Sequence, residues 1–198
     1  MSPFETFKEA LVNADVAAFK FINITLHNKV LAVMMKFTAN DIFLATLLFA
    51  GLVFLVRKGG AREKVNTAFT LWALIIVNIV NTHLLKVFFK RQRPLVELED
   101  INVLVKLRYY GYAFPSTHTA MATVIATVLW QDYKKFRPFL VLFVFLVGFF
   151  CIYTGGHYPL DVLGGVVVGL VFGIIINYFK KLYLRSAGCR MPGGELKD

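Results

Sequence analysis

The chain alternates long apolar blocks with short polar segments, a pattern that predicts membrane-spanning helices. The clear apolar spans lie at about 41–56, 67–89, 118–131, 138–154 and 161–179. Some of these are shorter than the ~20 apolar residues that a bilayer requires, so we expect the helices to extend past these limits. The pattern therefore predicts at least five spans.

The N-terminal segment has a different pattern. Between residues 3 and 22, apolar side chains lie among polar positions: Phe4, Phe7, Leu11, Phe19 and Ile22. This spacing predicts an amphipathic helix in the membrane interface, and part of residues 15–37 leaves a sixth span open. The predicted fold class is all-α, a polytopic membrane bundle of five to six transmembrane helices with an N-terminal amphipathic helix.

Composition strengthens this interpretation. Of 198 residues, 58% are hydrophobic and 17% are charged, and a soluble domain of this size could not hide so much apolar surface. We expect one membrane domain over residues 1–185, with its core motifs at 86–161, and a polar tail at 186–198. Two cysteines, Cys151 in an apolar run and Cys189 in the tail, argue against a disulfide framework.

The net charge of +10 indicates orientation rather than nucleic-acid binding, because the basic residues cluster at the ends of apolar segments. The short connections 57–66 and 132–137 are basic and are predicted to be cytoplasmic. The segments 90–117 and 155–160 would then face the periplasmic, extracytoplasmic side of the inner membrane. The segment 90–117 is also basic, so some of its positive charge needs a reason other than membrane orientation. Nothing in the sequence predicts an oligomeric state.

Three polar islands lie on that predicted outer face: KVFFKRQRP (86–94), PSTH (115–118) and TGGHYPLD (154–161). His83, just before the first island, and Lys86 and Lys90 within it are spaced three and four apart, so we expect them to share one helix face.

Each island taken alone also has a purely structural interpretation. The cations within 86–93 are typical of interfacial side chains that reach for water. Ser116–Thr117 is a typical helix start. His157 suits an interfacial position, with Asp161 complementing the dipole of the next helix, and His83 suits a packed or pore-facing position.

Together, the islands favour chemistry on a phosphate. A helix N-terminus binds anions through its free N–H groups, and Lys and Arg add charge and forked donors. One histidine can attack phosphorus while a carboxylate orients it, and the other can protonate the leaving oxygen. Because no carboxylate pair or Cys/His cluster suggests a metal centre, neither a metal nor a cofactor is expected.

The three motifs resemble those of the membrane type 2 phosphatidic acid phosphatases, a family that shares its fold with vanadium haloperoxidases. The family pattern is Lys, six residues, Arg-Pro; then Pro-Ser-Gly-His; then Ser-Arg, five residues, His, three residues, Asp. The matching positions here are Lys86, Arg93, Pro94, Pro115, Ser116, Thr117, His118, His157 and Asp161.

The resemblance implies a role for each matching residue. His157 would be the nucleophile that forms a phosphohistidine, Asp161 its partner, and His118 the general acid and then the base for water. The residues implied to bind the phosphate are Lys86, Arg93, Ser116 and Thr117, the last in place of the family glycine. Further candidate substrate contacts are His83, Lys90, Arg91 and Arg108.

One departure is serious, because Cys151 stands where the family pattern has arginine. Either a basic residue of the 90–108 loop substitutes for that arginine, or activity is reduced, or the chain is inactive. The resemblance implies an integral membrane lipid phosphatase, and in bacterial relatives the substrates are phosphatidylglycerol phosphate, undecaprenyl pyrophosphate or the 1-phosphate of lipid A. The alternative is a catalytically impaired lipid-phosphate binder or transporter. A soluble haloperoxidase is excluded by the apolar spans.

Overall fold

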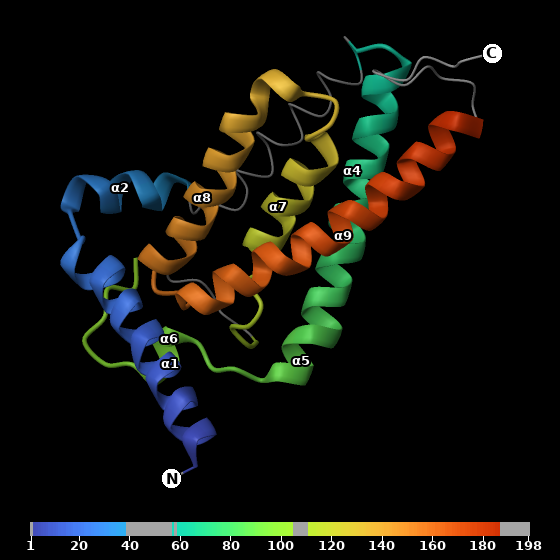
Figure 1. Cartoon of the computed structure of the whole chain (residues 1–198). Helices are drawn as coiled ribbons and strands as arrows, with labels where there is room; N and C mark the ends of the chain where they lie inside the picture. The colour runs from blue at the N-terminus through green and yellow to red at the C-terminus, as the bar shows by residue number, and fades with distance from the viewer. Residues whose placement is uncertain (1, 39–56, 58, 105–110, 187–198) are drawn as a thin grey trace.

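The structure, a computed structural model, describes residues 2–38, 57, 59–104 and 111–186. These residues form helices and connecting turns and contain no strand, which confirms the all-α prediction for this part of the chain. The helices are α1 (Pro3–Lys20), α2 (Lys29–Thr38), α4 (Ala61–Val80), α5 (Lys86–Phe89), α6 (Pro94–Glu97), α7 (Thr117–Leu129), α8 (Arg137–Tyr153) and α9 (Pro159–Ser186). In Figure 1, α7 lies among α4, α8 and α9, and α1 lies at the end of the bundle away from the C-terminus.

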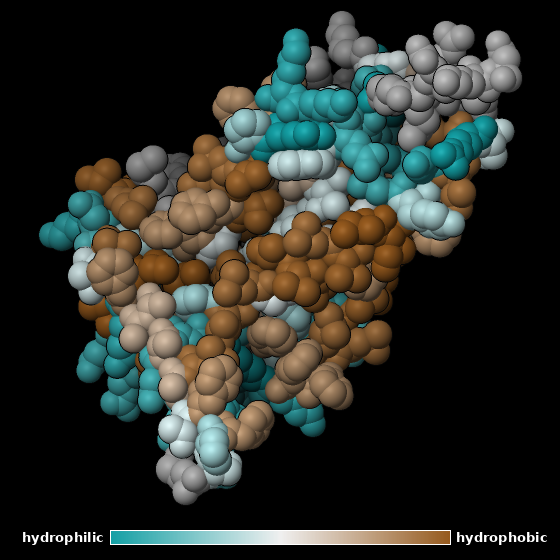
Figure 2. Space-filling model, viewed as in Figure 1, coloured by the Kyte–Doolittle hydropathy of each residue, from teal (hydrophilic) through white to brown (hydrophobic). Residues whose placement is uncertain are grey.

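Every predicted span that falls within the described residues lies on a helix. Among the described residues, three stretches are long and apolar enough to cross a membrane, Ala61–Glu97, Lys134–Tyr153 and Pro159–Ser186, and α7 is a shorter apolar helix. Figure 2 shows hydrophobic side chains over the middle of the molecule along α8 and α9, with hydrophilic side chains gathered at the end where α4 begins. The predicted span at 41–56 lies outside the described residues, so a total of five to six spans stays a prediction.

The N-terminal segment forms two helices rather than one rod. A capping box starts α1, in which the Ser2 hydroxyl accepts from the Glu5 amide and the Glu5 carboxylate accepts from the Ser2 amide. A π-helical turn, Phe21–Thr25, extends α1, and the helix then breaks at 26–28 before α2, which runs at a steep angle to α1 in Figure 1. Residues 15–37 therefore do not form a single continuous helix.

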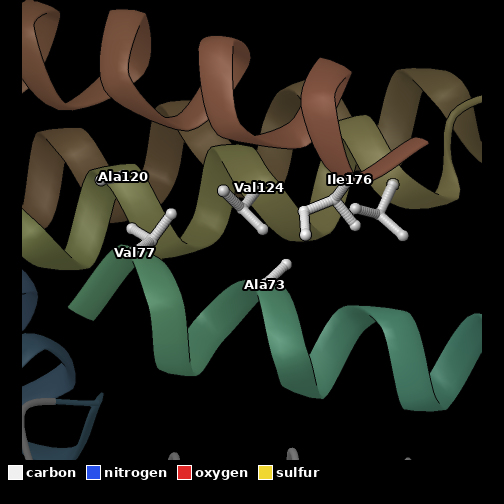
Figure 3. Packing of buried hydrophobic residues seen from close by; sticks show 6 residues of the cluster. Ala73, Val77, Ala120, Val124 and Ile176 are labelled. Carbon is white, nitrogen blue, oxygen red and sulfur yellow. The ribbon is translucent and has the colours of Figure 1, made fainter. Parts of the chain in front are cut away.

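Helix α7 supplies the centre of the core. Its buried Ala120, Val124 and Val128 pack against α4 and α9 in the cluster drawn in Figure 3. The partners are Ala73 and Val77 of α4 and Ile176 of α9. Short side chains dominate this cluster, so the helix axes can approach closely.

Glycines make the contact between α7 and α9 especially close. A Cβ added at Gly169 would lie 2.5 Å from the Ala120 carbonyl oxygen, and one added at Gly165 would lie 2.5 Å from the Ser116 carbonyl oxygen. The Ser116 amide also donates to the Asp161 carbonyl at 2.9 Å. This contact places the start of α7, with the second motif, against the start of α9, with the third.

A partly buried ion network holds the opposite end of the bundle. The Asp132 carboxylate accepts from Lys180 Nζ at 2.8 Å and from Arg62 Nε at 3.1 Å. Burial by itself raises the pKa of Asp132, but the hydrogen bonds and charges of Lys180 and Arg62 outweigh burial and lower it. Arg62, which belongs to a predicted topogenic segment, therefore also links α4 to the α7–α8 connection.

Candidate active site

The first motif lies where α5 ends and the chain turns back. Lys86 and Arg93 are both buried, and both hold the segment that precedes the second motif. Lys86 Nζ donates to the Tyr112 carbonyl at 2.6 Å, and Arg93 Nε donates to the Gly111 carbonyl at 3.1 Å. Lys90, with a left-handed φ of 49°, ends α5 and reverses the chain between the two cations. The first and second motifs are thus joined by main-chain carbonyls.

The other predicted contacts near this motif lie in different surroundings. His83 and Lys90 are exposed whereas Lys86 is buried. A π-helical turn, Asn81–Leu85, precedes Lys86, so the α-helical spacing that predicted one shared face does not describe these three side chains. Arg108 lies outside the described residues.

The second motif begins α7. Ser116 is the N-cap residue, but its side chain makes no capping hydrogen bond. Its fully buried hydroxyl accepts from the Thr119 hydroxyl at 3.1 Å and faces the Cys151 sulfur at 3.8 Å. Ser116 therefore lies at the start of a helix, as its sequence context predicts, but its hydroxyl is directed into the site and does not cap the helix.

The next two residues of this motif lie in different surroundings. The Thr117 hydroxyl accepts from the Asn81 side-chain amide at 2.7 Å, so it is directed toward the π-helical turn after α4. The same amide donates to the Pro115 carbonyl at 3.0 Å. His118 is exposed in the first turn of α7. Asn81, which belongs to none of the three motifs, thus accommodates threonine at the family's glycine position.

The third motif buries His157 in the loop between α8 and α9. Gly155 has a φ of 86°, and a Cβ there would lie 3.2 Å from the Asn102 carbonyl, so this turn favours glycine. His157 Nε2 lies 3.2 Å from an Arg93 terminal nitrogen, and Nδ1 lies 3.6 Å from Asp161 Oδ2. A guanidinium only donates, so Nε2 accepts, and the proton of the neutral ring is on Nδ1 facing Asp161.

Burial keeps the His157 ring neutral. It lowers the pKa of His157 to about 4, and the positive charges of Arg93 and Lys86 act in the same direction, while Asp161 opposes them. At neutral pH the ring therefore carries a lone pair on Nε2, the nitrogen that faces the buried cations. This is the form of histidine that can act as a nucleophile.

Asp161 is fully buried, and both of its carboxylate oxygens are held. Oδ2 accepts from the Tyr158 amide at 2.8 Å, and Oδ1 accepts from Arg91 at 2.9 Å. The other terminal nitrogen of Arg91 donates to Asp15 of α1 at 2.5 Å. Arg91, predicted as a substrate contact, is thus bound to two carboxylates. Asp15 was missed because one acidic residue in a polar helix is a weak signal.

Cys151, at the position of the family arginine, belongs to the same cluster. The Ser116 hydroxyl lies 3.8 Å from its sulfur, and its carbonyl accepts from the His157 amide at 3.1 Å. The thiol is buried and supplies neither a positive charge nor a forked donor. The departure from the family pattern therefore lies beside the nucleophile candidate.

The site and the fold point to one class of protein. Among the residues that the structure describes, no group of three His, Cys, Asp or Glu side chains is placed to hold a metal ion. Buried cations beside a helix N-terminus suit phosphate oxygens, and a neutral histidine suits attack at phosphorus. The apolar helices suit a lipid. Membrane lipid phosphatases combine these two properties.

The chain belongs to the PAP2 superfamily, whose family model matches residues 66–184. It is 31% identical over 167 residues to undecaprenyl-diphosphatase BcrC of Bacillus subtilis (strain 168), a match that covers 83% of each chain. It is 24% identical over 163 residues to bacitracin transport permease protein BcrC of Bacillus licheniformis, covering 82% of this chain and 78% of the relative.

Solved structures agree with this assignment. The crystal structure of Aquifex aeolicus LpxE is similar with a TM-score of 0.69 and 35% identity, over 81% of this chain and 93% of that one. A PAP2-type phosphatidylglycerolphosphate phosphatase from Bacillus subtilis has the same fold, with a TM-score of 0.66 and 24% identity over 87% of each chain. The family predicted from the three motifs is confirmed.

Proposed function

We propose that this protein hydrolyses the phosphate of an anionic membrane lipid through a phosphohistidine intermediate. The observation that carries the proposal is the environment of His157. Its Nε2 lies 3.2 Å from Arg93, and its Nδ1 faces the buried carboxylate of Asp161. A phosphate bound by Arg93 would therefore meet the lone pair of a neutral imidazole whose opposite side is backed by negative charge.

In the first step, Nε2 of His157 attacks phosphorus and the bond from phosphorus to the lipid-side oxygen breaks. His118, protonated beforehand, gives its proton to that oxygen. Asp161 stabilises the positive charge that develops on the His157 ring. The groups that bind the non-bridging oxygens are Lys86, Arg93, Ser116 and the first amides of α7, including that of Thr117.

In the second step, His118 takes a proton from water as the water oxygen attacks phosphorus. The phosphorus–nitrogen bond breaks, inorganic phosphate leaves, and both histidines return to their starting states. The different exposure of the two rings suits these roles, because the His157 ring is buried whereas the His118 ring is exposed to water. The scheme uses no metal ion and no cofactor.

The candidate substrates are undecaprenyl pyrophosphate, phosphatidylglycerol phosphate and the 1-phosphate of lipid A. The first is favoured by the 31% identity to a protein named undecaprenyl-diphosphatase. We further propose five to six spans in the inner membrane, with the site on the periplasmic side. The support is that the site and the basic segments 57–66 and 132–137 lie at opposite ends of the bundle (Figure 1). Exposed Phe4, Phe7 and Leu11 suit an interfacial α1.

Release of inorganic phosphate by the purified protein in detergent, measured on short-chain analogues of the three lipids, tests the proposed reaction. His157→Gln is expected to abolish turnover and the acid-labile labelling of the enzyme by a ³²P substrate. His27→Gln is the matched control, because His27 stacks on Tyr153, the last residue of α8, and is not part of the proposed scheme. Retained turnover in folded His157→Gln, or loss of wild-type turnover with a chelator, contradicts the proposal.

The acid role of His118 has its own test. His118→Ala should reduce turnover of alkyl phosphates strongly and of aryl phosphates less, because an aryl leaving group needs no proton. The ratio of the two rates in each protein is the measurement. Equal losses for both substrates would remove His118 from this role.

The alternative is a lipid-phosphate binder or transporter that does not turn over its ligand. The buried Cys151 in place of the family arginine favours it, and one relative is named a transport permease protein. Saturable binding of a lipid phosphate with no phosphate release from any of the three lipids would support this second function.

A further inference from the structure

Helix α1 reaches the site through one line of buried side chains. Asp15, Phe19 and Asn23 are spaced four residues apart and are buried, whereas the preceding part of α1 is exposed. The Phe19 ring meets the Tyr158 ring edge-on, with 5.5 Å between centroids. The Asn23 side-chain amide donates to the Tyr153 carbonyl at 2.8 Å. We call Asp15, Phe19 and Asn23 the docking stripe; it lies against the loop that holds His157.

Asp15 binds two groups of the site itself. Its Oδ1 accepts from the Leu160 amide at 2.8 Å, one of the N–H groups that the first turn of α9 cannot satisfy internally. Its Oδ2 accepts from Arg91, whose other terminal nitrogen donates to Asp161 at 2.9 Å. Arg91 thus bridges a carboxylate of α1 and the carboxylate that backs His157.

The Arg91 bridge matters because Asp161 is fully buried, so the orientation of its carboxylate depends on the donors that hold it. The Arg91 guanidinium is held by the two carboxylates and by the face of the Tyr158 ring, 4.3 Å from its centroid. Its side chain is 24% exposed, so without Asp15 it can turn toward water. Asp161 then loses a rigid partner on the side opposite His157, and the 3.6 Å approach to Nδ1 is no longer fixed.

We propose that Asp15 is a positioning residue, which acts through Arg91 to fix Asp161 and thereby the ring of His157, without touching the phosphate. The proposal rests on the phosphohistidine reaction proposed above. It assigns α1 a part in turnover as well as in attachment to the membrane interface. Outer-shell groups that orient a reacting side chain in this way act on the rate more than on ligand binding.

Asp15→Asn tests the proposal, because asparagine keeps the shape and an acceptor for Leu160 while it removes the charge that binds Arg91. We expect kcat to fall by about 10- to 100-fold, the range in which displacement of a reacting group by ~1 Å is felt. KM and competitive inhibition by inorganic phosphate should not change, since Asp15 has no contact with the phosphate-binding residues. Glu9→Gln, an exposed acid in the same helix, is the matched control and should keep the wild-type kcat.

A double-mutant cycle with Arg91→Lys separates positioning from helix docking, because lysine cannot fork between two carboxylates. If Asp15 acts through Arg91, Asp15→Asn should lower kcat little further in a protein that already carries Arg91→Lys. Additive losses, or wild-type kcat in a folded Asp15→Asn protein, overturn the proposal. Should Asp15→Asn fail to fold, full activity of Arg91→Lys overturns it instead. Wild-type enzyme in the same assay distinguishes this proposal from the proposed function, since an absence of wild-type turnover would contradict the phosphatase function itself.

Discussion

Replacing Cys151 by arginine restores the group that the family pattern has beside the nucleophile. Cys151 is 4% exposed and its sulfur lies 3.8 Å from the Ser116 hydroxyl, so an arginine there would bring forked donors to the proposed phosphate site. One preorganised donor to a developing charge is worth about 3–4 kcal/mol. Forcing a larger side chain into packed surroundings costs about 1–3 kcal/mol, part of which is lost alignment. If about 2 kcal/mol of the donor's contribution is lost to imperfect alignment, the remaining gain of about 1.4 kcal/mol corresponds to roughly a tenfold rise in kcat.

The assay is kcat on one lipid phosphate for wild type and Cys151→Arg, with thermal melts to show that both are folded. Cys151→Ala is the matched control, because it removes the thiol without adding a donor and should give no gain. An arginine variant that folds normally and turns over no faster would refute the reasoning and show that another cation already serves. Arg91 is bound to two carboxylates, so Arg108 would be the next residue to mutate.

Three further predictions test the packing, the protonation and the orientation. Gly169→Ala places a Cβ 2.5 Å from the Ala120 carbonyl and should lower stability by about 1–3 kcal/mol. Gly60→Ala meets the Glu63 carboxylate only at 3.4 Å and should cost less, under about 1 kcal/mol, because Gly60 is the N-cap of α4; equal melting temperatures of the two variants would contradict the close contact of α7 and α9. Burial lowers the pKa of His157 to about 4, so below about pH 6.5 the unfolded chain takes up a proton that the folded ring does not yet bind. Wild-type stability should therefore fall by about 3 kcal/mol between pH 6.5 and 4, and His157→Gln should lack this part of the decline; identical pH dependences would refute it. A cysteine at exposed Glu99, with Cys151 and Cys189 replaced, should react with an impermeant thiol reagent in intact cells, and labelling only after lysis would invert the proposed orientation.

Features that depend on local pattern could be read from the sequence. Apolar blocks predicted the helices, because burial in lipid or protein requires a run of apolar residues whatever the helix later contacts. Motif spacing predicted Lys86, Arg93, Ser116 and His157 as one site, and the structure brings Arg93 within 3.2 Å of His157. The catalytic roles, the orientation and the number of spans stay predictions.

The partners of these residues were decided by the tertiary structure. Asp15 and Arg91 are 76 residues apart, and Asn81 and Thr117 are 36 apart, yet each pair forms a hydrogen bond. Such pairs depend on how closely whole helices approach, which the glycines of α9 and the π-helical turn after α4 determine. A single helix carries no information about the polar group it will meet on another. The sequence alone therefore determined the helices and the motif residues, whereas packing decided that Arg91 binds two carboxylates and that α1 lies against the loop that holds His157.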